Sequence, residues 1–145
     1  MAIVDTSVWI DILRDRSGRK RARLEALIDP RDVLLTPFCE LELLQGCRDE
    51  RDWSLLREYL ATQDYLEPRR DTWAAAARIA FDLRRRGRTV RSPIDCCIAQ
   101  LAIENDVALL HRDRDFSTIA GIRPLRQQWL GWRETGIRMG YRPNY

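Results

Sequence analysis

The sequence predicts an α/β fold, a three-layer α/β/α sandwich built around a mostly parallel sheet. Short, nearly continuous apolar runs at 2–4, 33–35 and 107–110 are typical of strands buried on both faces of such a sheet. Longer segments with helical periodicity separate these runs, and this alternation favours parallel strands joined by right-handed crossovers. The 145 residues, 45% hydrophobic and 32% charged, suffice for one domain with a substantial core.

The expected elements follow in chain order. The strand 2–4 ends in Asp5, Thr6 and Ser7, all good helix caps, so a helix should begin near Thr6. Further helices are predicted where a cap or Pro opens an apolar-periodic segment and Gly or a basic turn closes it. These segments are 19–28, 36–46, 53–61, 71–87 and 92–106, with a short helix around 116–120 after the last predicted strand.

Composition excludes several classes of protein. No apolar run approaches the ~20 residues that cross a membrane, so we expect no membrane partner. Acids interrupt any signal-peptide core near the N-terminus, and a cytoplasmic location is the expectation. The four cysteines lack a C-x-x-C spacing and are interpreted as reduced thiols. His111 is the single histidine, which argues against a zinc site.

Basic residues are clustered although the net charge is only +3. All but one of the 25 are Arg, and they concentrate in 14–23, in 84–91 and after Gly121. The guanidinium fork suits phosphate groups. On charge alone, solvated helix ends and a phosphate-binding surface are equally good interpretations.

Acidic residues stand where two predicted strands end. Asp5 follows the first strand, and Asp113 and Asp115 follow the strand 107–110. If these strands are parallel, the acids share one edge of the sheet. Each acid also has a structural interpretation: Asp5, Asp113 or Asp115 can cap a helix, and Asp95 fits a capping box with Ser92. The positive end of the helix dipole should keep Asp95 ionised.

The segment 36–46 carries two further acids inside an apolar helix. Glu40 and Glu42 are two residues apart and therefore point in nearly opposite directions, so one site can use only one of them. Several carboxylates at one edge would repel one another, by ~4 kcal/mol for two charges ~4 Å apart at an effective dielectric of 20. Protons or cations must offset this repulsion, and oxygen ligands suit Mg²⁺ or Mn²⁺.

These residues resemble those of the PIN-domain nucleases, in particular the VapC toxins of prokaryotic toxin–antitoxin pairs. The resemblance rests on VDTSVWI at the start, ELLQG at 42–46, SPIDCCIAQLA at 92–102 and LLHRDRDF at 109–116. It covers residues 1–126, which we expect to form the PIN-like nuclease domain. Residues 127–145 would then be an extension that packs on the domain or on a partner.

The resemblance assigns roles to individual acids. Asp5, Glu42, Asp95 and Asp113 match the family's catalytic and metal-binding acids, which selects Glu42 over Glu40. In supporting roles, Ser7 matches a hydroxyl that often contacts the metal-bound waters, and Asp115 assists from nearby. The family's properties imply Mg²⁺- or Mn²⁺-dependent cleavage of RNA, a small VapB-type antitoxin as partner, and a homodimer.

The predicted function is that of a metal-dependent endoribonuclease in which a metal-activated water attacks the RNA phosphodiester. Cleavage through the 2′-hydroxyl usually needs two histidines, and His111 is alone. The alternatives are a catalytically silent PIN-fold module that binds RNA or a partner, and a structure-specific DNA nuclease. A phosphotransfer enzyme with a strand-end aspartate is disfavoured because Ser7 stands where the second aspartate of such enzymes belongs.

Two features depart from the family pattern. His111 stands where many relatives have threonine, which could alter a hydrogen bond near the site. The end of the chain, WLGWRETGIRMGYRPNY, interleaves aromatic residues with Arg. Such a mixture can stack on bases, although packing on the domain or a partner is the favoured interpretation.

Overall fold

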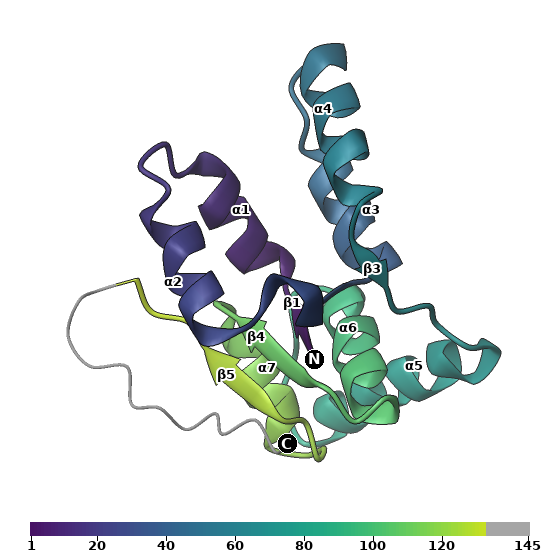
Figure 1. Cartoon of the computed structure of the whole chain (residues 1–145). Helices are drawn as coiled ribbons and strands as arrows, with labels where there is room; N and C mark the ends of the chain where they lie inside the picture. Colours follow the sequence, from purple (N-terminus) through teal and green to yellow (C-terminus); the bar gives the residue numbers. More distant parts are fainter. Residues whose placement is uncertain (133–145) are drawn as a thin grey trace.

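A computed structural model of the chain describes residues 1–132 (Figure 1). The strands are β1 (Ala2–Val4), β2 (Val33–Leu35), β3 (Asp64–Tyr65), β4 (Ala108–His111) and β5 (Gln127–Trp129). The helices are α1 (Thr6–Arg14), α2 (Arg19–Leu27), α3 (Pro37–Gln45), α4 (Glu50–Leu60), α5 (Arg70–Arg85), α6 (Pro93–Glu104) and α7 (Arg114–Ala120), with a 3₁₀ turn, η1 (Pro30–Asp32). The predicted α/β/α class is confirmed.

The sheet has the strand order β3-β2-β1-β4-β5, and every neighbouring pair is parallel. The chain steps outward from β1 to β3, then crosses back to β4 and continues to β5. With right-handed crossovers, this reversal places the helices before and after β3 on opposite faces of the sheet. The reversal leaves β1 beside β4, and in open parallel sheets such a point forms a crevice beyond the carboxyl ends of the strands.

The core is continuous across both faces of the sheet. Ile3, Leu35 and Leu109 on the central strands are completely buried, as are Ile79 of α5 and Phe116 of α7. All four cysteines are free, and three of them are buried, in agreement with the predicted reduced thiols. Figure 1 shows α3 and α4 together as an arm that stands away from the sheet. None of the helices within residues 1–132 combines the length and apolar character that a membrane span requires.

The two edge strands were not predicted from the sequence. β3 has two residues and β5 has three, and both are partly exposed and carry polar side chains, so neither shows an apolar run. β5 falls in the segment 127–145, which we expected to be an extension. In the structure it pairs with β4 over Leu109–His111 and so belongs to the sheet. The rest of that segment, 133–145, lies outside the described residues.

Candidate active site

The carboxyl ends of β1 and β4 are joined by a chain of hydrogen bonds. Val4 pairs with Leu110 in the sheet register, and the Asp5 N–H donates to the Leu110 carbonyl at 2.9 Å. The Ser7 hydroxyl accepts from the Arg112 N–H at 3.0 Å and donates to Asp5 Oδ2 at 2.5 Å. Ser7 therefore links the loops after the two strands and orients the first carboxylate.

One carboxylate oxygen of Asp5 caps a helix, and the other is not needed for the cap. Its Oδ2 accepts from the Ser7 N–H at 2.9 Å as the cap of α1, as the structural interpretation proposed. Its Oδ1 is buried and has no hydrogen-bond partner among residues 1–132. Burial raises the pKa of Asp5, and the bonds from Ser7 only partly offset this. A buried carboxylate oxygen without a donor is destabilising unless a proton or cation accompanies it.

The two glutamates of α3 point to different neighbours, as their spacing predicted. Glu40 lies 3.8 Å from Arg57 of α4 in a surface ion pair. Glu42 turns toward α1, where its Oε1 accepts from the Thr6 hydroxyl at 2.9 Å. Burial raises the pKa of Glu42, and the negative charges of Asp5 and of Asp113, which follows β4, raise it further. Glu42, and not Glu40, therefore belongs to the cluster of acids.

Asp95 lies in the first turn of α6 and is 7% exposed. The cap of this helix is the Ser92 hydroxyl, which accepts from the Ile94 N–H at 3.2 Å. Within the described chain, the Asp95 carboxylate makes no reciprocal bond to the Ser92 N–H, so the capping box is not formed.

Burial and the neighbouring acids make the surroundings of Asp95 unfavourable to its charge. Burial raises its pKa to about 8, with further increases from the carboxylates of Asp5, Asp113, Glu42 and Asp115. The expectation that the helix dipole keeps Asp95 ionised was therefore wrong for the metal-free protein. Burial and four neighbouring acids outweigh one helix end.

The loop after β4 supplies two more carboxylates. Asp113 caps α7 by accepting from the Asp115 N–H at 3.0 Å. The Arg91 guanidinium donates to both carboxylate oxygens of Asp113 at 2.7 Å. The backbone N–H of Arg91 donates to the Asp115 carboxylate at 2.9 Å. Oxygens of Asp95, Asp113 and Asp115 all lie within 4.8 Å of one another. Asp115, expected to assist from nearby, is thus as close to this cluster as the two acids predicted to bind metal.

Three carboxylates therefore lie within 4.8 Å of one another, and the charges of Asp5 and Glu42 reach Asp95 as well. The guanidinium of Arg91 contacts two of the five, Asp113 and Asp115, and this excess of negative charge suits a cation. Arg91 was not predicted as a site residue, although it ends the basic run 84–91 directly before SPID. The donor set is oxygen only, which fits a hard ion such as Mg²⁺ or Mn²⁺. Asp5 Oδ1, which has no donor in the described part of the chain, and the raised pKa of Asp95 are consistent with such an ion as the counter-charge.

His111 cannot serve as an acid or base toward solvent. Its side chain is completely buried at the end of β4, and burial lowers its pKa. Both ring nitrogens are engaged, Nδ1 with the Asp113 N–H at 3.1 Å and Nε2 with Gln127 Oε1 at 2.5 Å. The chain has no other histidine, so acid–base chemistry by a histidine pair is excluded.

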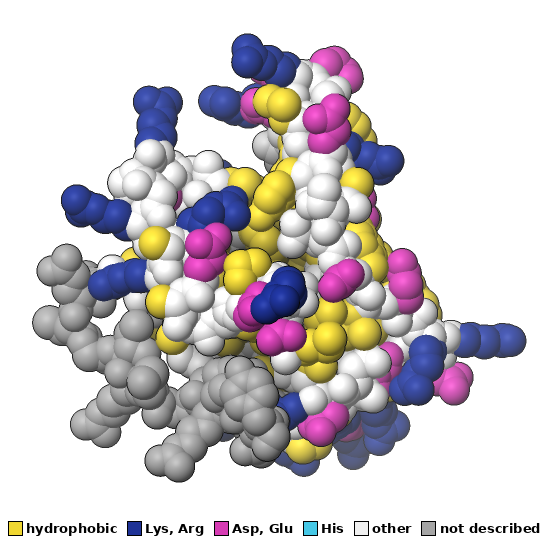
Figure 2. All heavy atoms as spheres, viewed as in Figure 1, with side chains coloured by type: hydrophobic (Ala, Val, Ile, Leu, Met, Phe, Trp, Pro, Cys, Tyr) yellow, Lys and Arg dark blue, Asp and Glu magenta, His cyan; other side chains and the backbone are white. Residues whose placement is uncertain are grey.

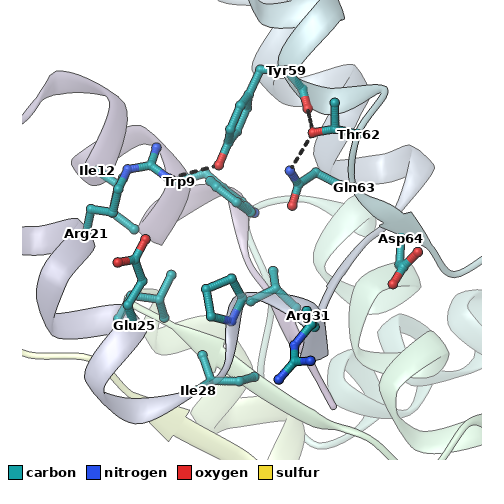
Figure 3. A pocket seen from close by; sticks show the side chains of 13 residues that line it. Trp9, Ile12, Arg21, Glu25, Ile28, Arg31, Tyr59, Thr62, Gln63 and Asp64 are labelled. Carbon is teal, nitrogen blue, oxygen red and sulfur yellow. Dashed lines mark hydrogen bonds between the residues drawn. The ribbon is translucent and has the colours of Figure 1, made fainter.

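A second feature is a cavity of about 420 Å³ between α1, α2 and α4 (Figure 3). Its wall combines apolar side chains with the rings of Trp9 and Tyr59, whose centroids are 5.9 Å apart. The Trp9 Nε1–H is buried without an acceptor among residues 1–132. Arg21 contacts the Tyr59 hydroxyl at 3.0 Å. Figure 2 shows apolar side chains in this hollow and charged groups around it. The cavity contains none of the five site carboxylates.

Comparison with known proteins identifies the family. The PIN domain family matches residues 2–122. The chain is 33% identical to the VapC ribonuclease Mb1587 of Mycobacterium bovis, across 87% of this chain and 96% of that protein. It is 30% identical to ribonuclease VapC51 of Mycobacterium tuberculosis, across 88% of this chain and 91% of that protein. The chain therefore belongs to the PIN-domain family, among the VapC ribonucleases.

Solved structures show the same fold. VapBC of Salmonella typhimurium, solved bound to DNA, has a TM-score of 0.73 at 20% identity and covers 88% of this chain and 96% of its own. VapBC-5 of Mycobacterium tuberculosis is described as a member of the VapBC family of toxin–antitoxin systems. It has a TM-score of 0.65 at 25% identity and covers 89% of this chain and 98% of its own.

Proposed function

We propose that this protein is a divalent-metal-dependent endoribonuclease and the toxin of a type II toxin–antitoxin pair in the cytoplasm. The observation that carries the proposal is the gathering of five carboxylates beyond the carboxyl ends of β1 and β4. The relatives of this chain are named ribonucleases, and solved structures with the same fold are toxin–antitoxin complexes. The buried single histidine removes the main route to RNA cleavage without a metal.

The residues that would hold the ion are Asp5, Asp95 and Asp113 with Glu42. When bound, Mg²⁺ or Mn²⁺ supplies Lewis-acid activation of a water and neutralises charge on the phosphate. Ser7 orients Asp5 through its 2.5 Å hydrogen bond and would contact waters at the ion. Arg91 bonds to Asp113 and Asp115, so an ion held by Asp113 would compete with this guanidinium for the carboxylate oxygens.

The RNA backbone would bind along the basic segment 84–91. This segment is largely exposed and ends at Arg91, whose guanidinium already contacts Asp113 at the site. Figure 2 shows Lys and Arg side chains projecting from several parts of the visible surface, with acids between them. Contacts with phosphates give an affinity that falls steeply with salt.

The antitoxin would dock in the cavity between α1, α2 and α4. An apolar wall, two aromatic rings and a buried Trp9 N–H that has no acceptor within residues 1–132 suit a peptide that brings an apolar side chain and a carbonyl acceptor. The predicted homodimer would use apolar surface outside this cavity, where Leu41 of α3 and Trp73 and Phe81 of α5 are large exposed side chains.

A silent binding module is the second candidate, because Arg91 already neutralises part of the cluster. A cleavage assay separates the two. Purified protein should cut RNA with Mg²⁺ or Mn²⁺, lose this activity in excess EDTA, and leave 5′-phosphate and 3′-hydroxyl ends. Asp95→Asn should abolish cleavage, whereas Asp71→Asn, at an exposed acid of α5, should not. Cleavage that persists in EDTA would contradict the proposed metal dependence. Preferential cutting of branched or single-stranded DNA would identify the protein as a DNA nuclease instead.

A further inference from the structure

His111 is a buried polar residue that the proposed chemistry does not use. It occupies the last position of β4, two residues before Asp113. Its ring lies against Phe116 of α7 and Trp129 of β5, with centroid distances of 5.1 and 5.8 Å. An apolar side chain would fill this space equally well, so the choice of an imidazole needs another reason.

The hydrogen bonds of the ring fix its tautomer. Nδ1 lies 3.1 Å from the Asp113 backbone nitrogen, which is an N–H and can only donate. Nδ1 must therefore carry no proton. The remaining proton of a neutral imidazole is then on Nε2, which faces Gln127 Oε1 at 2.5 Å. The ring consequently accepts from the loop that holds Asp113 and donates to β5.

The C-terminal segment of the described chain contacts this loop once more directly and once through Asp11 of α1. The Leu130 N–H donates to the His111 carbonyl at 2.8 Å. The Trp132 indole N–H donates to Asp11 of α1 at 2.6 Å. The same Asp11 carboxylate accepts from the Arg112 guanidinium, and Arg112 stands between His111 and Asp113. Gln127 and Leu130 thus contact His111 directly, and Trp132 shares the Asp11 carboxylate with Arg112.

We propose that His111 is a positioning residue for the metal site, and that Gln127 of β5 sets its tautomer. The imidazole bond to the Asp113 N–H directs the backbone turn from which the Asp113 carboxylate projects toward Asp95. The sheet's last strand is thereby part of the support of the acidic cluster. This inference rests on the proposed function, because it assigns His111 a purpose within the same site.

One spectroscopic measurement tests the inference in the wild-type protein. The chain contains one histidine, so a long-range ¹H–¹⁵N correlation spectrum shows a single imidazole. The structure requires the neutral ring with its proton on Nε2 at neutral pH. A ring protonated on Nδ1, or on both nitrogens, cannot accept the Asp113 N–H and would overturn the proposal.

Two substitutions at the same position separate positioning from packing. In His111→Asn, a carbonyl oxygen can take the place of Nδ1 and accept from Asp113, but the side chain is too short for Gln127. In His111→Gln, the amide can reach Gln127, but no acceptor stands near the Asp113 N–H. Both variants lose the ring contacts with Phe116 and Trp129, and the shorter Asn leaves the larger void, so a loss of packing alone cannot favour His111→Asn over His111→Gln.

Mn²⁺ binding, measured by calorimetry, is the readout. His111→Asn should bind within about threefold of wild type, and His111→Gln should bind about 10- to 100-fold more weakly, as for the loss of other groups that orient metal ligands. Gln127→Leu should weaken binding in the same direction, whereas Gln128→Leu on the opposite side of β5 should not. Equal losses in the Asn and Gln variants would reduce His111 to packing and overturn the inference.

Failure of the inference and failure of the proposed function give different results. If the wild-type protein neither binds Mn²⁺ nor cuts RNA, the metal-dependent function is wrong, and the tautomer spectrum still decides whether His111 accepts from Asp113. If the wild type binds Mn²⁺ and the two His111 variants bind it equally well, the result is compatible with the proposed function but contradicts the positioning role of His111.

Discussion

Replacing Asp95 by Asn should stabilise the metal-free protein while it abolishes cleavage. The Asp95 carboxyl group is buried and faces four other acids, which together raise its pKa from 3.8 to about 8. Between these two values the folded state holds a proton that the unfolded state releases. The free energy of unfolding of the wild type therefore falls as the pH rises through this interval.

The size of the effect follows from the same shift. Each pKa unit corresponds to about 1.4 kcal/mol, and about three units separate the ordinary value from neutral pH, which gives about 4 kcal/mol for Asp95. Asn removes this term and keeps the shape of the side chain, but its amide must still be buried. We expect a net gain of about 2–4 kcal/mol, or about 5–15 °C in Tm.

Urea unfolding in EDTA, followed by circular dichroism between about pH 5 and pH 8, measures this gain. The wild type should lose stability toward the upper end of that range, and Asp95→Asn should show a flatter dependence. Asp71→Asn is the control, because its carboxylate is exposed in the first turn of α5. If Asp95→Asn instead unfolds several kcal/mol more easily and still cuts RNA, Asp95 is a helix-capping residue and the electrostatic reasoning is wrong.

Three further results are expected. Because Asp95 must lose its proton to bind a cation, apparent Mg²⁺ affinity in the cleavage assay should rise by as much as about tenfold per pH unit below pH 8; a flat profile would contradict this. Tyr59→Ala should weaken antitoxin binding in calorimetry at least about tenfold with cleavage intact, unlike the exposed neighbour Glu58→Ala. Trp73→Glu should shift the protein to monomer in size-exclusion chromatography, and an unchanged elution volume would place the dimer elsewhere.

The central strands and main helices could be predicted because their signals are local. The run Ala2–Val4 is apolar, and Thr36 and Ser92 stand at helix starts as caps that accept from the backbone. The edge strands could not be predicted, because Asp64–Tyr65 and Gln127–Trp129 are short, polar and partly exposed. Their strand conformation comes from pairing with a neighbour, which a single segment does not encode.

The candidate site was predictable only in part. Asp5 and Asp113 follow from strands that end at one edge, whereas the selection of Glu42 over Glu40 needed the family resemblance. Arg91 was missed because its partners lie 22 and 24 residues away in the chain. The hydrogen bonds of His111 depend on Gln127, in a strand that the sequence did not reveal.

The most direct test of the account is the position of Mn²⁺ in crystals of the protein, located by its anomalous scattering. We predict a peak in contact with the carboxylates of Asp95 and Asp113, with the Arg91 guanidinium displaced from Asp113. No peak at this cluster at saturating Mn²⁺, with Arg91 still bonded to Asp113, would contradict it.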